Sequence, residues 1–211
     1  MIITKILYFL IPLNIFLVFF WAPSVEILGN LSRIIFFHVP CAWVSVLAFL
    51  ISGTYSLIFV LDKNKKFTEV EVKSHQAAKL GFIFTILTTV SGSIWAKLSW
   101  GSFWNWDPRE TSILILLLIF VAYFSLSASL EKKENKAKIT SSYLILAMIT
   151  VPFLIFIIPK AYPTLHPNPI LNEKKKIFLD QKIKITLLVS VISFSFLFFS
   201  LLSFINKKIK K

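Results

Sequence analysis

The stretch TSILILLLIFVAYFSLSASL, residues 111–130, contains no charged side chain. A helix of about 20 predominantly apolar residues has the length needed to cross the hydrocarbon core of a bilayer. Five other apolar runs of similar length are bounded by charges, prolines or glycines. The sequence therefore predicts an all-α integral membrane protein, one membrane domain over residues 1–211 with six transmembrane helices at about 2–22, 37–61, 77–98, 111–130, 140–159 and 184–205.

The composition supports this class. The chain is 56% hydrophobic and 16% aromatic, with 22 phenylalanines among 211 residues, more apolar surface than a soluble domain of this size can bury. A net charge of +13 would suggest nucleic-acid binding in a soluble protein. Here the lysines flank apolar runs, where they meet lipid headgroups, so we expect membrane lipid and no nucleic acid as a partner.

The distribution of Lys and Arg predicts the orientation. Most of the 23 lie near the N-terminus, in 62–79, in 131–139 and in the C-terminal tail. The excess of positive charge on the cytoplasmic side places both termini in the cytoplasm. A lysine run in 174–184 opposes the bias, and is either a solvated, lipid-facing stretch or a docking surface for an acidic partner. The outer connections are then 23–36, 97–110 and 160–184.

The stretch SWGSFWNWDPRETS, residues 99–112, overlaps the outer connection 97–110 and has four aromatic residues within seven positions: Trp100, Phe103, Trp104 and Trp106. Tryptophan gathers at membrane interfaces, so an aromatic belt is one interpretation. A flat apolar platform for a planar ligand is the other. The following DPRE sequence is typical of a helix start, with Asp107 as N-cap, Pro108 in the first turn and Glu110 completing a capping box.

Two of the three histidines share the outer face. His38 lies at the outer end of 37–61 and His166 lies in 160–184, whereas His75 is expected to be solvated before the third span. Nearby prolines predict non-helical backbone at both outer histidines. Cys41 is expected to be a small buried apolar residue, and as the one cysteine it excludes an internal disulfide.

Two neutral imidazoles on opposite faces of an iron porphyrin would form a bis-histidine haem site beside the tryptophans. The alternative is that each interfacial histidine hydrogen-bonds a carbonyl. Zinc fits less well, because structural sites take four Cys or His ligands and catalytic sites usually three. Cations on the same face would suit the haem propionates, and these are Arg33, Arg109 and Lys160.

WGSFWNWDPRETS resembles the tryptophan-rich (WWD) domain of the haem-handling membrane proteins of cytochrome c-type biogenesis. RIIFFHVPCAWVSVL and TLHPNP are similar to the histidine-bearing outer segments of one family, the haem exporter protein C family (CcmC). The resemblance implies a multi-pass protein of the bacterial inner membrane whose haem site faces the periplasm. It implies haem b as ligand, His38 and His166 as axial ligands, and a site completed by Trp100, Phe103, Trp104, Trp106 and Asp107.

The resemblance also implies a function in haem transport without a catalytic residue, so the chain is not expected to be an enzyme. Haem would pass to a periplasmic haem chaperone (CcmE-like), beside an ABC transporter ATPase and further membrane subunits. The chain has no Walker motif, so ATP hydrolysis would belong to a partner. The alternative is a synthetase-type subunit, related to CcsA and CcmF, that attaches haem to apocytochrome; Pro-Arg-Glu after Asp107 is similar to that branch.

Overall fold

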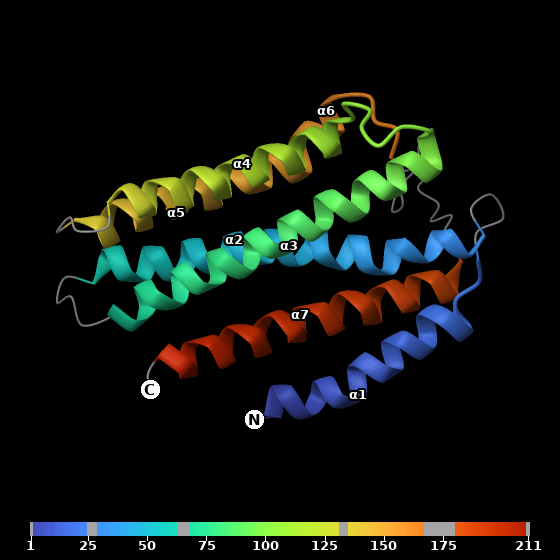
Figure 1. The fold of residues 1–211 in the computed structure, drawn as a ribbon, viewed down its shortest axis with the longest axis horizontal. Coiled ribbons are helices and arrows are strands. Elements are labelled where there is room, and N and C mark those ends of the chain that lie inside the picture. Colours follow the sequence, from blue (N-terminus) through green and yellow to red (C-terminus); the bar gives the residue numbers. More distant parts are fainter. Residues whose placement is uncertain (1, 25–28, 63–67, 131–134, 167–179, 210–211) are drawn as a thin grey trace.

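The computed structural model describes residues 2–24, 29–62, 68–130, 135–166 and 180–209. Six helices in these ranges are long and apolar enough to cross a membrane, and no β-strand occurs in them. The all-α class and the six spans are therefore confirmed. α1 begins and α7 ends toward the same end of the bundle (Figure 1), as an even number of spans requires.

The helices follow the chain with short irregular turns at some ends. Two π-helical segments, η1 and η3, extend the first and fifth spans, and a 3₁₀ turn, η2, precedes the second. The elements are α1 (Ile2–Phe16), η1 (Leu17–Trp21), η2 (Asn30–Ile34), α2 (Ile35–Leu61), α3 (Thr68–Trp100), α4 (Pro108–Ser129), α5 (Lys136–Pro152), η3 (Phe153–Ile157), α6 (Ile158–Ala161) and α7 (Gln181–Ile209).

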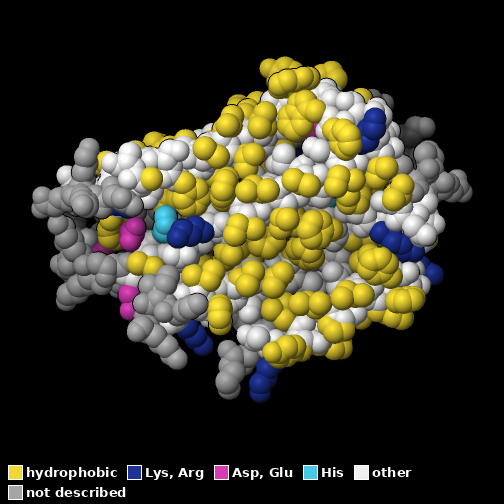
Figure 2. All heavy atoms as spheres, in the orientation of Figure 1, with side chains coloured by type: hydrophobic (Ala, Val, Ile, Leu, Met, Phe, Trp, Pro, Cys, Tyr) yellow, Lys and Arg dark blue, Asp and Glu magenta, His cyan; other side chains and the backbone are white. Residues whose placement is uncertain are grey.

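The second helix occupies the centre of the bundle. It packs against α3, α5 and α7, while α4 covers α3 and α5, and α1 lies at the edge against α7 (Figure 1). Stacked rings of Phe49 and Phe120, 3.9 Å between centroids, join α2 to α4. Cys41 is fully buried between α2, α3 and α7, as expected. Apolar side chains cover the middle of the face in Figure 2, with Lys and Arg toward its ends, as in a bilayer.

The third helix begins earlier than the apolar pattern indicated, at Thr68 rather than about 77. Acidic residues in its first turn, Glu69 and Glu71, favour the positive end of the helix dipole. His75 is consequently inside the helix, and the expectation of a solvated residue is wrong. Its Nδ1 lies 2.8 Å from the hydroxyl of Tyr123 in α4, because the face of α3 that packs against α4 continues beyond the apolar run.

Candidate functional site

The aromatic connection is shorter than 97–110, because both flanking helices extend into it. Trp100 is the last residue of α3 and Pro108 the first of α4, which leaves residues 101–107 as the loop. Gly101, with φ of 84°, turns the chain out of α3 in a conformation that favours glycine. The Ser102 hydroxyl donates to the carbonyl of Trp104 at 3.0 Å, so the loop is internally braced.

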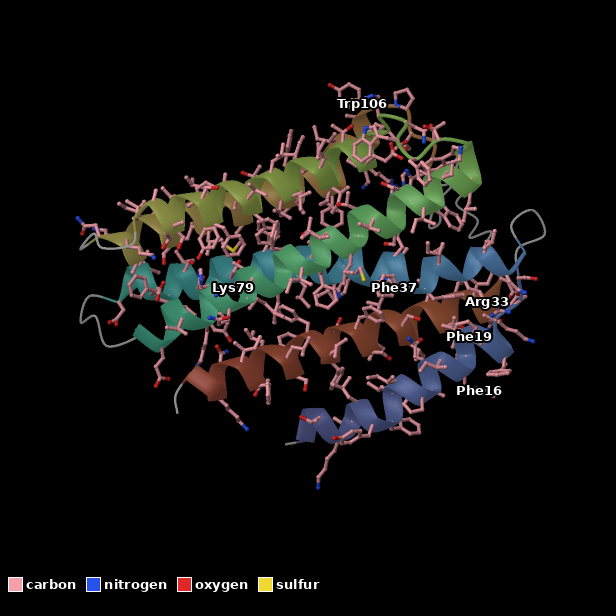
Figure 3. All side chains as sticks on the ribbon, in the orientation of Figure 1. Phe16, Phe19, Arg33, Phe37, Lys79 and Trp106 are labelled. Carbon is pink, nitrogen blue, oxygen red and sulfur yellow. The ribbon has the colours of Figure 1, made fainter. Side chains whose placement is uncertain are left out.

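The aromatic side chains of this loop point outward. Phe103 is 58% exposed and Trp106 is 72% exposed. The rings of Trp104 and Trp106 meet edge to face, 5.9 Å between centroids. Figure 3 shows Trp106 where the loop passes α6, at one end of the bundle. The loop thus presents an apolar aromatic surface at that end.

Asp107 joins this loop to the segment that carries His166. It is the N-cap of α4, as predicted: its Oδ1 accepts from the Arg109 amide at 2.8 Å, within a capping box completed by Glu110. The same carboxylate accepts from the Thr164 hydroxyl and the Leu165 amide, both at 2.7 Å, and from His166 Nδ1 at 2.9 Å. Asp107, which is 3% exposed, therefore positions both the aromatic loop and the segment that carries His166.

The electrostatics of this pair favour a neutral imidazole and an ionised carboxylate. Burial lowers the pKa of His166 below its usual value, although Asp107 opposes the shift. Burial works against ionisation of Asp107, but hydrogen bonds from Thr164, Arg109 and Leu165 hold the pKa of its carboxyl below the usual value. His166 then donates its Nδ1 proton to Asp107 and keeps the lone pair on Nε2 for a ligand.

His38 is held between α2 and α3. Its Nδ1 lies 3.1 Å from the hydroxyl oxygen of Ser91, whose own proton goes to the carbonyl of Leu87 at 2.6 Å. With its own proton engaged there, the Ser91 hydroxyl oxygen can accept an Nδ1 proton from His38, a tautomer that would leave the lone pair on Nε2. The ring lies against Gly92, where an added methyl group would come within 2.8 Å of Cε1.

The expectation of non-helical backbone is wrong at His38. The histidine and Pro40 both lie within α2. Pro40 costs one backbone hydrogen bond, but it is buried with its neighbours among α2, α3 and α7, and this packing outweighs the local preference. At His166 the backbone is non-helical, as expected.

The structure brings His166 together with part of the aromatic stretch, whereas His38 lies further along α3, beside Ser91. The Trp100 ring meets the His166 ring edge-on, 4.8 Å between centroids, and His38 lies about two helical turns from Trp100 along α3. A positive charge on the His166 imidazole would repel a positive charge on His38. His75 lies near the other end of α3 from Trp100.

The three cations expected near the haem propionates have different surroundings. Arg33 donates to the Val18 carbonyl and to Asn30 Oδ1, and its guanidinium lies over the Phe19 ring. Figure 3 shows Arg33 and Phe19 on the opposite side of the bundle from Trp106. Arg109 and Lys160 are exposed, and the charge of Arg109 acts on His166. Arg109 therefore lies nearest the site.

Ser91, Gly92 and Thr164 are site residues that sequence reasoning missed. Each acts through a contact between separate elements, and no local pattern marks them. Within the described ranges, no group of three or more His, Cys, Asp or Glu is arranged to hold a metal ion. The arrangement offers two imidazoles, each with Nδ1 occupied, beside an aromatic surface.

The family model described as heme exporter protein C matches residues 1–210 of the chain. The chain belongs to the heme exporter protein C family. A putative cytochrome c biosynthesis ccmC-like mitochondrial protein of Marchantia polymorpha is 36% identical over 90% of this chain and 78% of its own length. The heme exporter protein C of Bradyrhizobium diazoefficiens is 30% identical over 85% and 67%. That of Escherichia coli K12 is 29% identical over 70% and 59%.

Membership of the heme exporter protein C family confirms the resemblance inferred from the sequence. Together with the six apolar helices, it makes the chain a multi-pass membrane protein. The chain motifs that indicated the family are the two histidine-bearing segments and the tryptophan-rich loop. The His166 segment and the tryptophan-rich loop meet at one end of the folded bundle. The His38 segment contacts α3 at Ser91.

Proposed function

We propose that the protein binds haem at this end of the bundle, with His38 and His166 as axial ligands, and delivers it for cytochrome c maturation. The observation that carries the proposal is the position of the two Nδ1 atoms: each lies within hydrogen-bond distance of an oxygen, of Ser91 or of Asp107, which favours the tautomer that leaves Nε2 for iron. Bis-histidine ligation needs this tautomer on both sides of the porphyrin.

The surrounding residues fit haem as a ligand. A porphyrin is a flat apolar disc, and the exposed rings of Phe103 and Trp106, with the half-buried ring of Trp104, offer a matching surface. Trp100 packs against His166 and limits the rotation of its ring. Arg109, exposed and close to His166, is the cation best placed for a propionate. The haem iron would be bound by the Nε2 lone pair of each histidine.

Delivery requires partners on the same side of the membrane. The Lys and Arg bias supports cytoplasmic termini, so the site would face the periplasm of a bacterial inner membrane. The acceptor would be a periplasmic haem chaperone, which forms the covalent bond itself, and an ABC ATPase with further membrane subunits would supply the energy. We expect no covalent step on this chain, whose one thiol, Cys41, is fully buried.

The test is the absorption spectrum of the detergent-purified protein from haem-replete cells. Wild type should carry a Soret band that weakens or shifts in both His38→Ala and His166→Ala. His75→Ala is the matched control, because this histidine contacts Tyr123 near the other end of α3, and it should keep the band. A band unchanged in both outer variants would contradict the ligand assignment.

A transfer assay separates delivery from synthesis. Haem-loaded protein is mixed with a purified periplasmic haem chaperone or with apocytochrome alone. Delivery predicts haem on the chaperone and none on apocytochrome. Attachment to apocytochrome without the chaperone would instead support the synthetase-type function.

A further inference from the structure

Glu110 makes more contacts than a helix cap requires. In an ordinary capping box this carboxylate accepts only the N-cap amide. Here Oε2 accepts from the Asp107 amide at 3.3 Å and also from the Asn105 amide at 2.7 Å. The residue is 8% exposed, and its other oxygen, Oε1, is buried with no hydrogen-bond partner among the described residues.

The two amides bound by Glu110 lie on either side of Trp106. This tryptophan has φ of 56°, the one positive φ among the described non-glycine residues. A bulky side chain in the left-handed region costs about 1 kcal/mol or more and needs surrounding contacts to persist. Trp106 is largely exposed, so its own packing does not supply them. The carboxylate of Glu110 bridges the turn instead.

We propose that Glu110 is a positioning residue of the outer site: it holds the left-handed turn at Trp106, which orients the Trp104–Trp106 pair and the Asp107–His166 hydrogen bond. For its effect on haem this inference rests on the function proposed above. The chain of contacts runs from Glu110 to the Asp107 amide, and from the Asp107 carboxylate to His166. Among the described residues, Glu110 makes no hydrogen bond to either imidazole: its hydrogen bonds act through the backbone, and its charge also acts on His166 across space.

Glutamine separates geometry from charge at this position. In Glu110→Gln the amide oxygen can still accept both backbone N–H groups, while its NH₂ group replaces the unpartnered oxygen. Glu110→Ala removes both hydrogen bonds. Asp180→Ala is the matched control, because Asp180 accepts the Lys182 amide at 2.7 Å at the start of α7, in an outer connection, and does not touch the aromatic loop.

The experiment combines two readouts in detergent. Near-ultraviolet circular dichroism of the haem-free protein reports the edge-to-face Trp104–Trp106 pair, and haem titration reports affinity. Glu110→Ala should lose much of the tryptophan signal and bind haem about tenfold or more weakly, the range typical for residues that support a metal ligand. Glu110→Gln and Asp180→Ala should retain both properties.

Either of two results would overturn the proposal. One is a Glu110→Ala variant with the wild-type tryptophan signal and affinity. The other is a Glu110→Gln variant as defective as Glu110→Ala, which would make the charge rather than the hydrogen bonds decisive. If wild type binds no haem, the proposed function fails, while the circular dichroism of the same variants still decides whether Glu110 holds the loop.

Discussion

His38 and His166 are held by opposite kinds of structure. His38 lies within a transmembrane helix, with Nδ1 beside the neutral hydroxyl of Ser91 and its ring against Gly92. His166 lies on a non-helical connection and gives its Nδ1 proton to the carboxylate of Asp107. A carboxylate deep between membrane helices is costly, whereas one at a helix N-terminus outside them is stabilised by amides.

This difference predicts that haem binding responds unequally to changes in the residues that support His38 and in those that support His166. A neutral hydroxyl supports the His38 tautomer without a charge that changes with pH. The carboxylate makes His166 a stronger electron donor and links it to the aromatic loop through Asp107. Haem binding at His38 should therefore depend mainly on the space around its ring. Haem binding at His166 should depend mainly on its hydrogen bond to the charged Asp107. The predictions below follow from that contrast.

Removing Asp107 should have the largest effect. Asp107→Ala deletes the α4 cap and the three hydrogen bonds from Thr164, Leu165 and His166. We expect haem affinity to fall by about 100-fold, and the loss of the cap to cost about 1 kcal/mol of stability. Haem titration and thermal unfolding measure the two effects. Affinity within threefold of wild type would show that His166 does not need this carboxylate.

Filling the space at Gly92 should be the next largest effect. Gly92→Ala places a methyl group against the His38 ring and should weaken haem binding about tenfold. Gly53→Ala is the matched control, because its methyl group would meet Met148 at the α2–α5 contact instead. That variant should unfold at lower temperature with an unchanged Soret position. Equal spectra for both variants would contradict a shape requirement at His38.

Acid should release haem through His166. Protonation of Nε2 competes with iron, so occupancy should fall as pH decreases below about 6.5, the usual pKa of histidine. The pKa of His166 in the folded protein is lowered, so its proton binds more readily to the unfolded state, and the stability of this segment also falls with acid.

The charge of Asp107 opposes that lowering. Asp107→Asn should therefore lower the pKa of His166 in the haem-free protein. An NMR titration of the imidazole across pH 4–8 measures that pKa. A higher pKa in the variant would contradict the assigned roles of the pair.

Ser91→Ala should have the smallest effect. It removes one neutral hydrogen bond, worth about 1 kcal/mol, so affinity should fall by no more than about fivefold. The ring would still lie between α2 and α3, against Gly92. Comparison with Asp107→Ala under the same conditions measures the contrast directly. A larger loss at Ser91 than at Asp107 would reverse the proposed ranking.

Local patterns determined much of what was predicted correctly. The six apolar runs specify six spans because a helix that crosses the hydrocarbon core of a bilayer needs about 20 apolar residues. DPRE specifies the start of α4 because capping involves only neighbouring residues. The histidine and tryptophan motifs indicated the family, which the comparisons confirm. Each of these signals is complete within a short segment.

Tertiary packing decided the rest. Pro40 signalled a helix end, yet burial among three helices keeps His38 within α2. The start of α3 is polar, so the sequence did not indicate that His75 contacts Tyr123. The supports of the two outer imidazoles come from residues 53 and 59 positions away in the chain, Ser91 and Asp107. Sequence alone thus determined the spans and the chemical groups. Tertiary contacts decided which oxygen lies beside Nδ1 of each imidazole, because those contacts join segments that no local pattern connects.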